Sequence, residues 1–555
     1  MRQITARTGA RILVDQLILH GVDTIFTVPG ESFLGVLDSL HDERQRVTVV
    51  TCRMEAGAAN MADAYGKLTD RPGICMVTRG PGASHAAVGV HTAAHDGTPM
   101  ILFIGQVARS MKGRGAFQEV DFDRMFGGIA KWTVELDDPA RIPELVARAF
   151  TVATSGQPGP VVVSMPEDLL EASAAVNDAP RYRVIQPSPS DQDMRHFDHL
   201  LRESKRPIII AGGGSWRAEA SHQLRLFAES RSIPVAAAFR SQDALNNDSD
   251  VYVGDLGLGQ NPALSNRVQQ SDLIIAAGTR LEENVTKGYQ LIDVPTPGAR
   301  LVHIHPDISE IGRVYQPELG INSSTDAFFA RANVSSAAGA FERSWLTGAR
   351  ADYRAFQQPP RAIGKVDMSA IVLALRQELP DDAIVTNGAG NYTVWLHRFW
   401  RYRGAKTQLA PTSGAMGYGV PAAVAAKIVA PDRVVVSFNG DGCFMMCGQE
   451  LATAVQYGVA PILVVVNNGM YGTIRMHQER NFPGRVMATD LVNPDFVALA
   501  RAHHADGEVV QQTDEFIPVL RRAIASQRPF LIEIRVDPEA LTPAQSLTEM
   551  RLAAG

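Results

Sequence analysis

Short runs of apolar residues alternate with longer stretches of helical periodicity along almost the whole chain. Each run has the length of a buried strand, and none approaches the roughly 18 residues of a membrane-spanning helix. The strands predicted in this way are residues 24–28, 47–50, 73–77, 99–105, 207–214, 233–238, 272–278, 300–305, 383–388, 433–440, 461–468 and 529–536. Strands that alternate with helices are typical of doubly wound parallel sheets, so the pattern predicts an α/β fold.

Two stretches interrupt this alternation. Residues 171–190 are rich in Ala, Pro, Ser and charged side chains, and residues 333–366 have a similar linker-like composition. We therefore predict three doubly wound α/β domains, at residues 1–175, 186–340 and 362–545.

The composition of the chain indicates a globular protein and gives no sign of nucleic-acid binding. With 45% hydrophobic and 20% charged residues the chain is typical of globular proteins, and its net charge of −6 shows no basic footprint for nucleic acid. The four scattered cysteines favour a reducing compartment, and the N-terminus lacks a signal-peptide pattern. We expect a cytoplasmic protein with neither a nucleic-acid nor a membrane partner.

One predicted helix carries an acid in an unusual place. In residues 52–68, CRMEAGAANMADAYGKL, Glu55 stands in the first turn beside small and apolar residues. A glutamate there favours the helix dipole, or is an ordinary surface residue, or is an acid placed for proton transfer. The stretch itself leaves all three interpretations open.

The most specific local pattern lies in the third block. A strand ends in the GDG of residues 440–442, a helix follows up to Gly458, and 24 residues separate GDG from the NN of residues 467–468. A right-handed crossover brings both strand ends to one edge of the sheet, so Asp441 and Asn468 are expected to converge. With a main-chain carbonyl, their oxygens suit Mg²⁺ or Ca²⁺, and the glycines and the helix start suit an anion. The pattern predicts a metal-bridged diphosphate.

Further motifs surround this pattern in a fixed order. They are TVPGESFLGVLDSL, MEAGAANMADAYGKLT, TRGPGASHAAVGVHTAAHDGTPMILFIGQV and GAFQEVD, then TSGAMGYGVPAA and NNGMYGTIRMHQE. Over nearly its whole length the chain resembles the thiamine diphosphate (ThDP) enzymes of the pyruvate oxidase and acetolactate synthase family. The resemblance implies pyrimidine-binding, central and diphosphate-binding domains of the ThDP-binding fold. It also implies a cofactor held between two subunits, hence at least a homodimer, and we expect a homotetramer.

The resemblance implies a role for particular residues. Asp441, Asn468 and the main-chain carbonyl of Met470 match the Mg²⁺ ligands, and Met416 matches the bulky residue that bends the cofactor. The other expected cofactor contacts are Ala389, Gly390, Asn391, Gly414, Gly440, Gly442 and Cys443. Glu55 matches the glutamate that hydrogen-bonds N1′ of the aminopyrimidine and takes part in proton transfer there. Relatives often carry Gln-His where this chain has Asn391-Tyr392.

The sequence is less informative about the residues that contact the substrate. Glu31, in VPGES, is either an acid at a turn or helix start, or an acid/base group near the reacting carbon. Gln118 is a further catalytic candidate by resemblance. The expected pocket residues are Phe117, Thr473, Ile474 and His477, and His477 stands where acetolactate synthases typically have a Trp.

The central block has AGGGS at residues 211–215, a weak dinucleotide signal. Relatives bind FAD there, an ADP-like nucleotide, or nothing. Arg280 is the expected nucleotide contact, but Gly259 and His305 replace a His and an acidic residue of the family pattern, which favours a central domain without FAD.

The resemblance implies a ThDP- and Mg²⁺-dependent lyase or carboligase that decarboxylates a 2-oxo acid and transfers the resulting enamine to a carbonyl acceptor, as in acetolactate synthases. Three alternatives stay open. They are a non-carboligating decarboxylase of the benzoylformate type, a diketone or 2-hydroxyacyl lyase, and a non-catalytic ThDP-binding scaffold.

Overall fold

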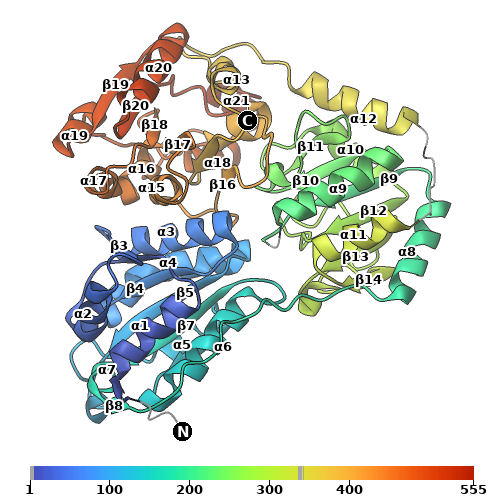
Figure 1. The fold of residues 1–555 in the computed structure, drawn as a ribbon. Helices are drawn as coiled ribbons and strands as arrows, with labels where there is room; N and C mark the ends of the chain where they lie inside the picture. The colour runs from blue at the N-terminus through green and yellow to red at the C-terminus, as the bar shows by residue number, and fades with distance from the viewer. Residues whose placement is uncertain (1–4, 215, 336–340, 342, 555) are drawn as a thin grey trace. The chain divides into compact units, whose positions relative to one another are not determined.

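The computed structural model, drawn as a ribbon in Figure 1, describes residues 5–214, 216–335, 341 and 343–554. By their internal contacts the described residues divide into two compact units. The first unit comprises the described part of residues 1–185 and two later segments, 420–430 and 447–459. The second comprises the described residues of 186–419, 431–446 and 460–555. Ser215 of the glycine-rich turn and residues 336–340 of the second predicted linker lie outside the described residues.

A parallel six-stranded sheet in the order β3-β2-β4-β5-β7-β6 forms the centre of the first unit. Its strands are β2 (Thr24–Thr27), β3 (Thr48–Thr51), β4 (Gly73–Val77), β5 (Met100–Gln106), β6 (Trp132–Glu135) and β7 (Pro160–Pro166). Its helices are α1 (Gly9–Leu19), α2 (Leu34–Asp42), α3 (Glu55–Thr69), α4 (Gly80–Asp96), α5 (Phe122–Phe126), α6 (Ile142–Thr154), α7 (Glu167–Glu171), α15 (Gly419–Val429, except Gly419) and α17 (Leu451–Gln456). The short strands β1 (Arg7–Thr8) and β8 (Ser173–Ala174) pair antiparallel.

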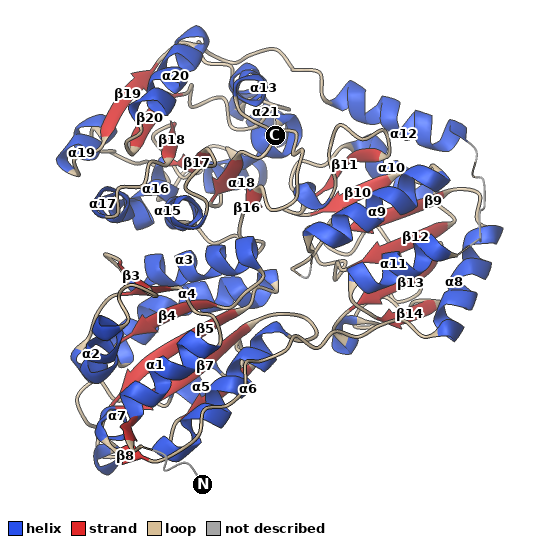
Figure 2. Cartoon of the chain, in the orientation of Figure 1, coloured by secondary structure: helices blue, strands red, loops and turns tan. Residues whose placement is uncertain are grey.

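Helices α3 and α4 lie side by side in this unit (Figure 2). Small residues allow the close approach, because a Cβ on Gly89 of α4 would overlap Ala59 of α3. The helix predicted within residues 52–68 is confirmed: α3 begins at Glu55 and is closed by Asp70 in the left-handed conformation, with φ of 56°.

The central sheet of the second unit has the order β11-β10-β9-β12-β13-β14, which is typical of dinucleotide-binding folds. Its strands, all parallel to their neighbours, are β9 (Pro207–Ala211), β10 (Val235–Ala238), β11 (Tyr252–Leu256), β12 (Leu273–Ala277), β13 (Arg300–His305) and β14 (Leu319–Asn322). The helices are α8 (Asp191–Glu203), α9 (Ala218–Arg231), α10 (Pro262–Gln270), α11 (Thr325–Val334) and α12 (Arg343–Phe356).

The last sheet, β16-β15-β17-β18-β20-β19, repeats the strand order of the first unit. Its parallel strands are β15 (Ile384–Asn387), β16 (Gln408–Leu409), β17 (Val435–Gly440), β18 (Ile462–Asn467), β19 (Asp506–Val510) and β20 (Phe530–Arg535). The helices are α13 (Met368–Glu378), α14 (Thr393–Phe399), α16 (Asp441–Cys447), α18 (Gly472–Asn481), α19 (Phe496–Ala502), α20 (Phe516–Ser526) and α21 (Leu547–Ala554). Each of the three sheets buries apolar side chains on its strands, so the predicted α/β fold class is confirmed.

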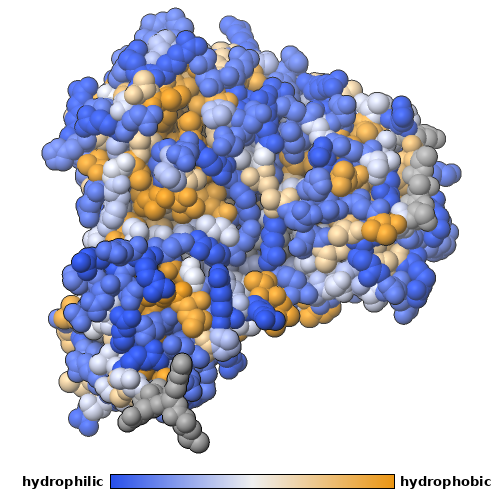
Figure 3. All heavy atoms as spheres, viewed as in Figure 1, coloured by the Kyte–Doolittle hydropathy of each residue, from blue (hydrophilic) through white to orange (hydrophobic). Residues whose placement is uncertain are grey.

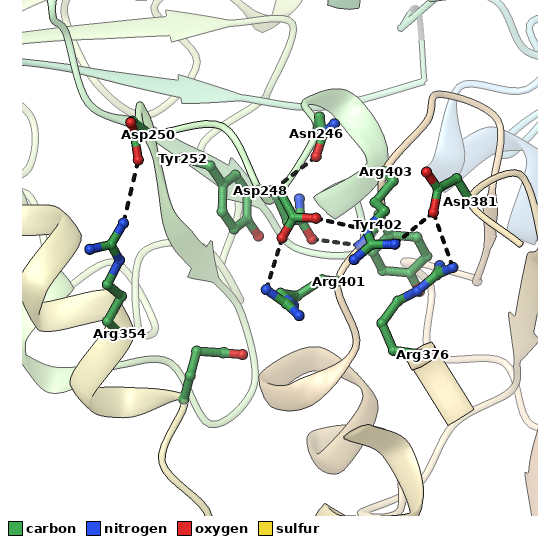
Figure 4. Close-up of polar contacts among 12 residues, drawn as sticks. Asn246, Asp248, Asp250, Tyr252, Arg354, Arg376, Asp381, Arg401, Tyr402 and Arg403 are labelled. Atoms are coloured by element: carbon green, nitrogen blue, oxygen red, sulfur yellow. Dashed lines mark hydrogen bonds and ion pairs between the residues drawn. The ribbon is translucent and has the colours of Figure 1, made fainter. Parts of the chain in front are cut away.

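Ion pairs connect a loop of the central block with the segment after α14 in the C-terminal block of the second unit (Figure 4). Asp248, after β10, accepts from Arg401 at 2.9 Å and from Arg403 at 2.7 Å. Arg403 also donates to Asp381 at 2.6 Å, and Arg376 lies 3.5 Å from the same carboxylate. A network of this kind stabilises an interface more than isolated exposed pairs do.

Hydrophilic residues cover most of the surface visible in Figure 3, and apolar residues appear there as separate patches. Within the described ranges, every helix is too short or too polar to cross a lipid bilayer.

The structure confirms the twelve predicted strands and corrects the second predicted linker. Residues 343–356 within it form helix α12, whose Trp345, Ala349 and Tyr353 are buried. These three side chains repeat every four residues, a helical spacing that the polar composition of the stretch obscured.

Candidate functional site

A cavity of about 250 Å³ lies at the carboxyl edge of the C-terminal sheet. It is bounded by the segments that follow β15, β16, β17, β18 and β20. Its lining residues are Ala389, Gly390, Asn391, Tyr392, Trp395, Gly414, Met416, Gly440, Asp441, Gly442, Cys443, Val466, Asn468, Met470, Tyr471, Gly472, Thr473, Ile474, Val536, Ala540 and Leu541. The carboxyl edge of a parallel sheet is the usual position of ligand sites in such folds.

The cavity brings together the residues of the C-terminal block that the sequence predicts as cofactor contacts, and also Thr473 and Ile474 of the predicted substrate pocket. His477, by contrast, is exposed on α18 and does not line the cavity. The predicted residues that line the cavity run from Ala389 to Ile474 in the sequence, and the structure gathers them at one edge of one sheet.

Asp441 is the one Asp, Glu, Lys, Arg or His among the described residues that line this cavity. It is 3% exposed, and its carboxylate accepts hydrogen bonds from the main-chain N–H of Gly442 at 2.8 Å and of Gly469 at 2.9 Å. Burial raises the pKa of Asp441, and the groups that donate hydrogen bonds to its carboxylate are neutral amides of Gly442, Gly469 and Asn493. A buried carboxylate of this kind is stabilised by a bound cation.

Asn493 is a further hydrogen-bond donor to Asp441. It was not predicted from the sequence. Its amide nitrogen donates to Asp441 at 2.8 Å and to Oδ1 of Asn467 at 3.0 Å. Asn468 Oδ1 accepts from Met470 N–H at 3.2 Å. Asn493 lies in an irregular segment after the NN pattern, where a single Asn carries no sequence signal.

The oxygen donors fit a hard cation. Asp441, Asn468 and the carbonyl of Met470 offer one carboxylate and two neutral oxygens, the chemistry that Mg²⁺ prefers in proteins. No group of three or more His, Cys, Asp or Glu suited to a metal occurs in the described part of the chain, as expected for a site with a single carboxylate.

The turn after β15 is fixed by contacts across the cavity. Asn391 N–H donates to Thr473 Oγ1 at 3.0 Å, and the Thr473 hydroxyl donates to Asn391 Oδ1 at 3.0 Å. Cys443 Sγ accepts from Gly417 N–H at 3.2 Å. A Cβ on Gly388 would overlap that sulfur, so only glycine fits where the turn begins.

Arg240 is a second contributor that the sequence did not reveal. It comes from the central sheet of the same unit and is 7% exposed. Its guanidinium donates to the carbonyl of Gly388 at 2.9 Å and to the carbonyl of Pro411. It thereby links the start of the 389–391 turn to the loop that carries Met416.

The first unit holds the other predicted acid, Glu55, as the first residue of α3. Its side chain is 13% exposed, and its Oε2 lies 3.0 Å from Nδ1 of His85 on α4. Glu450, which is fully buried, accepts from the main-chain N–H groups of Arg53 and Met54 at 3.0 Å each. Neither His85 nor Glu450 was singled out by the sequence.

The remaining candidates lie on loops at the carboxyl edge of the first sheet. Glu31 follows β2 with its side chain 71% exposed and 3.8 Å from Arg79, which suits an acid at the start of a short 3-10 helix. Phe117 is 72% exposed. Gln118 has a φ of 65°, and its carbonyl accepts from Gly80 N–H at the start of α4.

In the central sheet, His305 at the end of β13 is fully buried, and burial lowers its pKa to about 4. It is therefore neutral near pH 7. Gly259 is in the left-handed conformation with φ of 72°.

Comparison with known proteins covers all three blocks. Residues 7–125, 195–331 and 388–534 match the models of the N-terminal TPP binding domain, the central domain and the C-terminal TPP binding domain of thiamine pyrophosphate enzymes. Thiamine pyrophosphate is another name for ThDP.

Curated relatives agree with these matches. The acetolactate synthase large subunit of Parasynechococcus marenigrum is 34% identical over 545 residues, which are 95% of this chain and 87% of the relative. The acetolactate synthase large subunit of Corynebacterium glutamicum is 32% identical over 96% of this chain and 87% of its own length. The probable acetolactate synthase large subunit of Methanocaldococcus jannaschii is 30% identical over 96% and 93%.

Proposed function

This chain belongs to the thiamine pyrophosphate enzymes, and from that premise we propose that it is a ThDP- and Mg²⁺-dependent carboligase acting on 2-oxo acids, similar to an acetolactate synthase. The observation that carries the proposal is the cavity of the C-terminal sheet, where Asp441, Asn468 and Met470 converge with the 389–391 turn.

Asp441, Asn468 and the carbonyl of Met470 would hold Mg²⁺, and the main-chain amides of Gly442 and Cys443 would hold the diphosphate. Bound ThDP supplies a carbon nucleophile and an electron sink, which together allow the bond between a carbonyl carbon and its carboxylate to break. Asn493 and Arg240 orient this site without belonging to the cofactor contacts that the sequence predicts.

Glu55 would hold a proton at the N1′ position of the cofactor. Its low exposure and its position at the start of α3 suit an acid that exchanges a proton with a ring nitrogen. A non-catalytic scaffold would not need an acid of this kind, so Glu55 favours turnover over binding alone.

We also propose that the chain forms at least a homodimer, with a homotetramer as the expected assembly, and that it resides in the cytoplasm. Large apolar side chains near the candidate sites are exposed: Met445 and Met446 on α16 at 48% and 42%, Phe117 at 72% and Ile474 at 54%. Exposed apolar residues at such positions suit contact with a second subunit. The measurement is the molar mass in solution, with and without ThDP and Mg²⁺; a monomer in both would contradict this part of the proposal.

The function is tested by product analysis. The purified protein, with ThDP and Mg²⁺, is given single 2-oxo acids, each with and without an aldehyde or a second 2-oxo acid as acceptor, and the products are identified by NMR. Products with a new carbon–carbon bond support the carboligase. Aldehyde alone would replace it by the non-carboligating decarboxylase, and the absence of any consumption would contradict both. An absorption spectrum of the same protein decides whether a flavin is bound, and we expect none.

A further inference from the structure

His85 and Glu55 form a pair whose members differ in their access to water. The distance between His85 Nδ1 and Glu55 Oε2 is 3.0 Å, which is that of a hydrogen bond. The His85 side chain is 54% exposed, whereas that of Glu55 is 13% exposed. The imidazole is thus the member of the pair that meets solvent.

The two oxygens of the Glu55 carboxylate have different surroundings. Oε2 is the atom that His85 contacts. Oε1 faces Gly82 in the first turn of α4, where an added Cβ would lie 3.4 Å from the oxygen. Gly82 has no side chain to contact Oε1, and His85 engages Oε2 alone, so Oε1 is the oxygen left for a second hydrogen-bond partner.

Glu450 fixes the main chain directly before Glu55. Glu450 binds the main-chain N–H groups of Arg53 and Met54, directly before Glu55. A Cβ on Gly57 would overlap the Glu450 carboxylate, so α3 packs closely against Glu450 at this point. The distance between Glu55 and His85 is therefore set by the packing of α3 against α4 and the Glu450 segment.

We propose that His85 is the residue through which Glu55 exchanges its proton with solvent. The proposal rests on the proposed function, in which Glu55 serves the cofactor ring through its other oxygen. A proton passes from the Glu55 carboxyl group to Nδ1 of neutral His85, which gives a carboxylate and an imidazolium. The imidazolium then loses its Nε2 proton to water and is left as the neutral tautomer that donates from Nδ1 to Glu55 Oε2. The net change is one proton from Glu55 to water, without any other reactant.

Imidazole suits this role because it gains and loses protons readily near neutral pH. An amide side chain at this position would keep the hydrogen bond to Glu55, but it could not transfer a proton from Glu55 to water. The two properties can therefore be separated by His85→Asn, which retains a donor, and His85→Ala, which removes both donor and ring.

The test uses the full-length protein loaded with ThDP and Mg²⁺ in D₂O, without any 2-oxo acid. Exchange of the cofactor C2 proton for deuterium is followed by NMR after acid quenching, and the dissociation constant of the cofactor is measured separately by fluorescence titration. For His85→Asn we expect an unchanged dissociation constant and exchange slowed by about 10-fold or more. For His85→Ala we expect a similar loss that added free imidazole partly restores. His95→Asn, a change of an exposed histidine on the same helix, is the matched control and should exchange like the parent.

Exchange at the parent rate in His85→Asn would overturn the proposal, as would an imidazole-insensitive His85→Ala. If His85→Ala does not fold, His85→Asn alone decides. Glu55→Gln separates this inference from its premise: parent-like exchange in Glu55→Gln would refute the role of Glu55 itself, whichever substrate the enzyme uses.

Discussion

Truncating Glu450 to alanine should release the start of helix α3 and with it Glu55. The Glu450 carboxylate is fully buried and accepts from the N–H groups of Arg53 and Met54, and from the Thr453 hydroxyl at 2.6 Å. Burial raises the pKa of Glu450, and the hydrogen bonds that it accepts offset part of this effect.

The loss in the free energy of opening α3 can be estimated from the hydrogen-bond donors that lose their acceptor. Glu450→Ala leaves two main-chain donors without their acceptor, at a cost of about 1–3 kcal/mol each, so the free energy of opening α3 should fall by about 2–6 kcal/mol. Arg53 and Met54 both donate to Oε1 of Glu450. Glu450→Gln keeps one acceptor oxygen that can serve both donors, so the free energy of opening should fall less than in Glu450→Ala.

Amide hydrogen exchange read by mass spectrometry on peptides of α3 measures this opening directly. The control is Glu144→Ala, since Glu144 pairs with Arg141 on the surface of α6 and should change exchange by less than about 0.5 kcal/mol. If α3 in Glu450→Ala were protected as well as in the parent, the assigned role of Glu450 would be wrong.

Asp441→Ala should weaken retention of ThDP and Mg²⁺ by about 100-fold or more in calorimetric titration, and an unchanged affinity would contradict the metal assignment. Because burial raises the pKa of Asp441, protons compete with the cation at a higher pH than for an ordinary aspartate, so affinity should fall as pH decreases through that raised pKa. Gly388→Ala should also lower cofactor affinity by overlap with Cys443 Sγ, and adding Cys443→Ala should restore part of it; no restoration would argue against this overlap. His305 and His397 are buried with pKa values lowered to about 4 and about 3, so the unfolded chain binds more protons below pH 6.5 and stability should decline from pH 6.5 towards pH 4, by about 3 kcal/mol from His305 alone. Urea unfolding at several pH values should show a smaller decline in His305→Gln, and an equal decline would refute the contribution of His305.

All interior strands except β7 could be predicted from the sequence, because they are buried on both faces and therefore form unbroken apolar runs. The strands that were missed, apart from β7, are edge strands. β16 has only the two residues Gln408–Leu409, β6 is half-buried along its length, and β19 begins with Asp506-Gly507. An edge strand faces solvent on part of its surface, so its apolar signal is weaker.

The site was predictable where its residues form a local pattern. Asp441 and Asn468 are separated by one βαβ unit, and the topology of a parallel sheet brings them to one edge. Asn493, Arg240 and His85 have no such pattern, because each reaches its partner through the packing of side chains between elements and not at the ends of two neighbouring strands. Sequence periodicity carries no information on contacts of that kind.

The role of Glu55 can be measured as the turnover of Glu55→Gln at saturating ThDP and Mg²⁺, together with the dissociation constant of the cofactor. Turnover should fall by about 100-fold or more while the dissociation constant stays within about 3-fold of the parent, because only the proton-holding group is lost. Glu144→Gln, on the surface of the same unit, should behave like the parent. Turnover at the parent rate in Glu55→Gln would show that this carboxylate does not activate the cofactor.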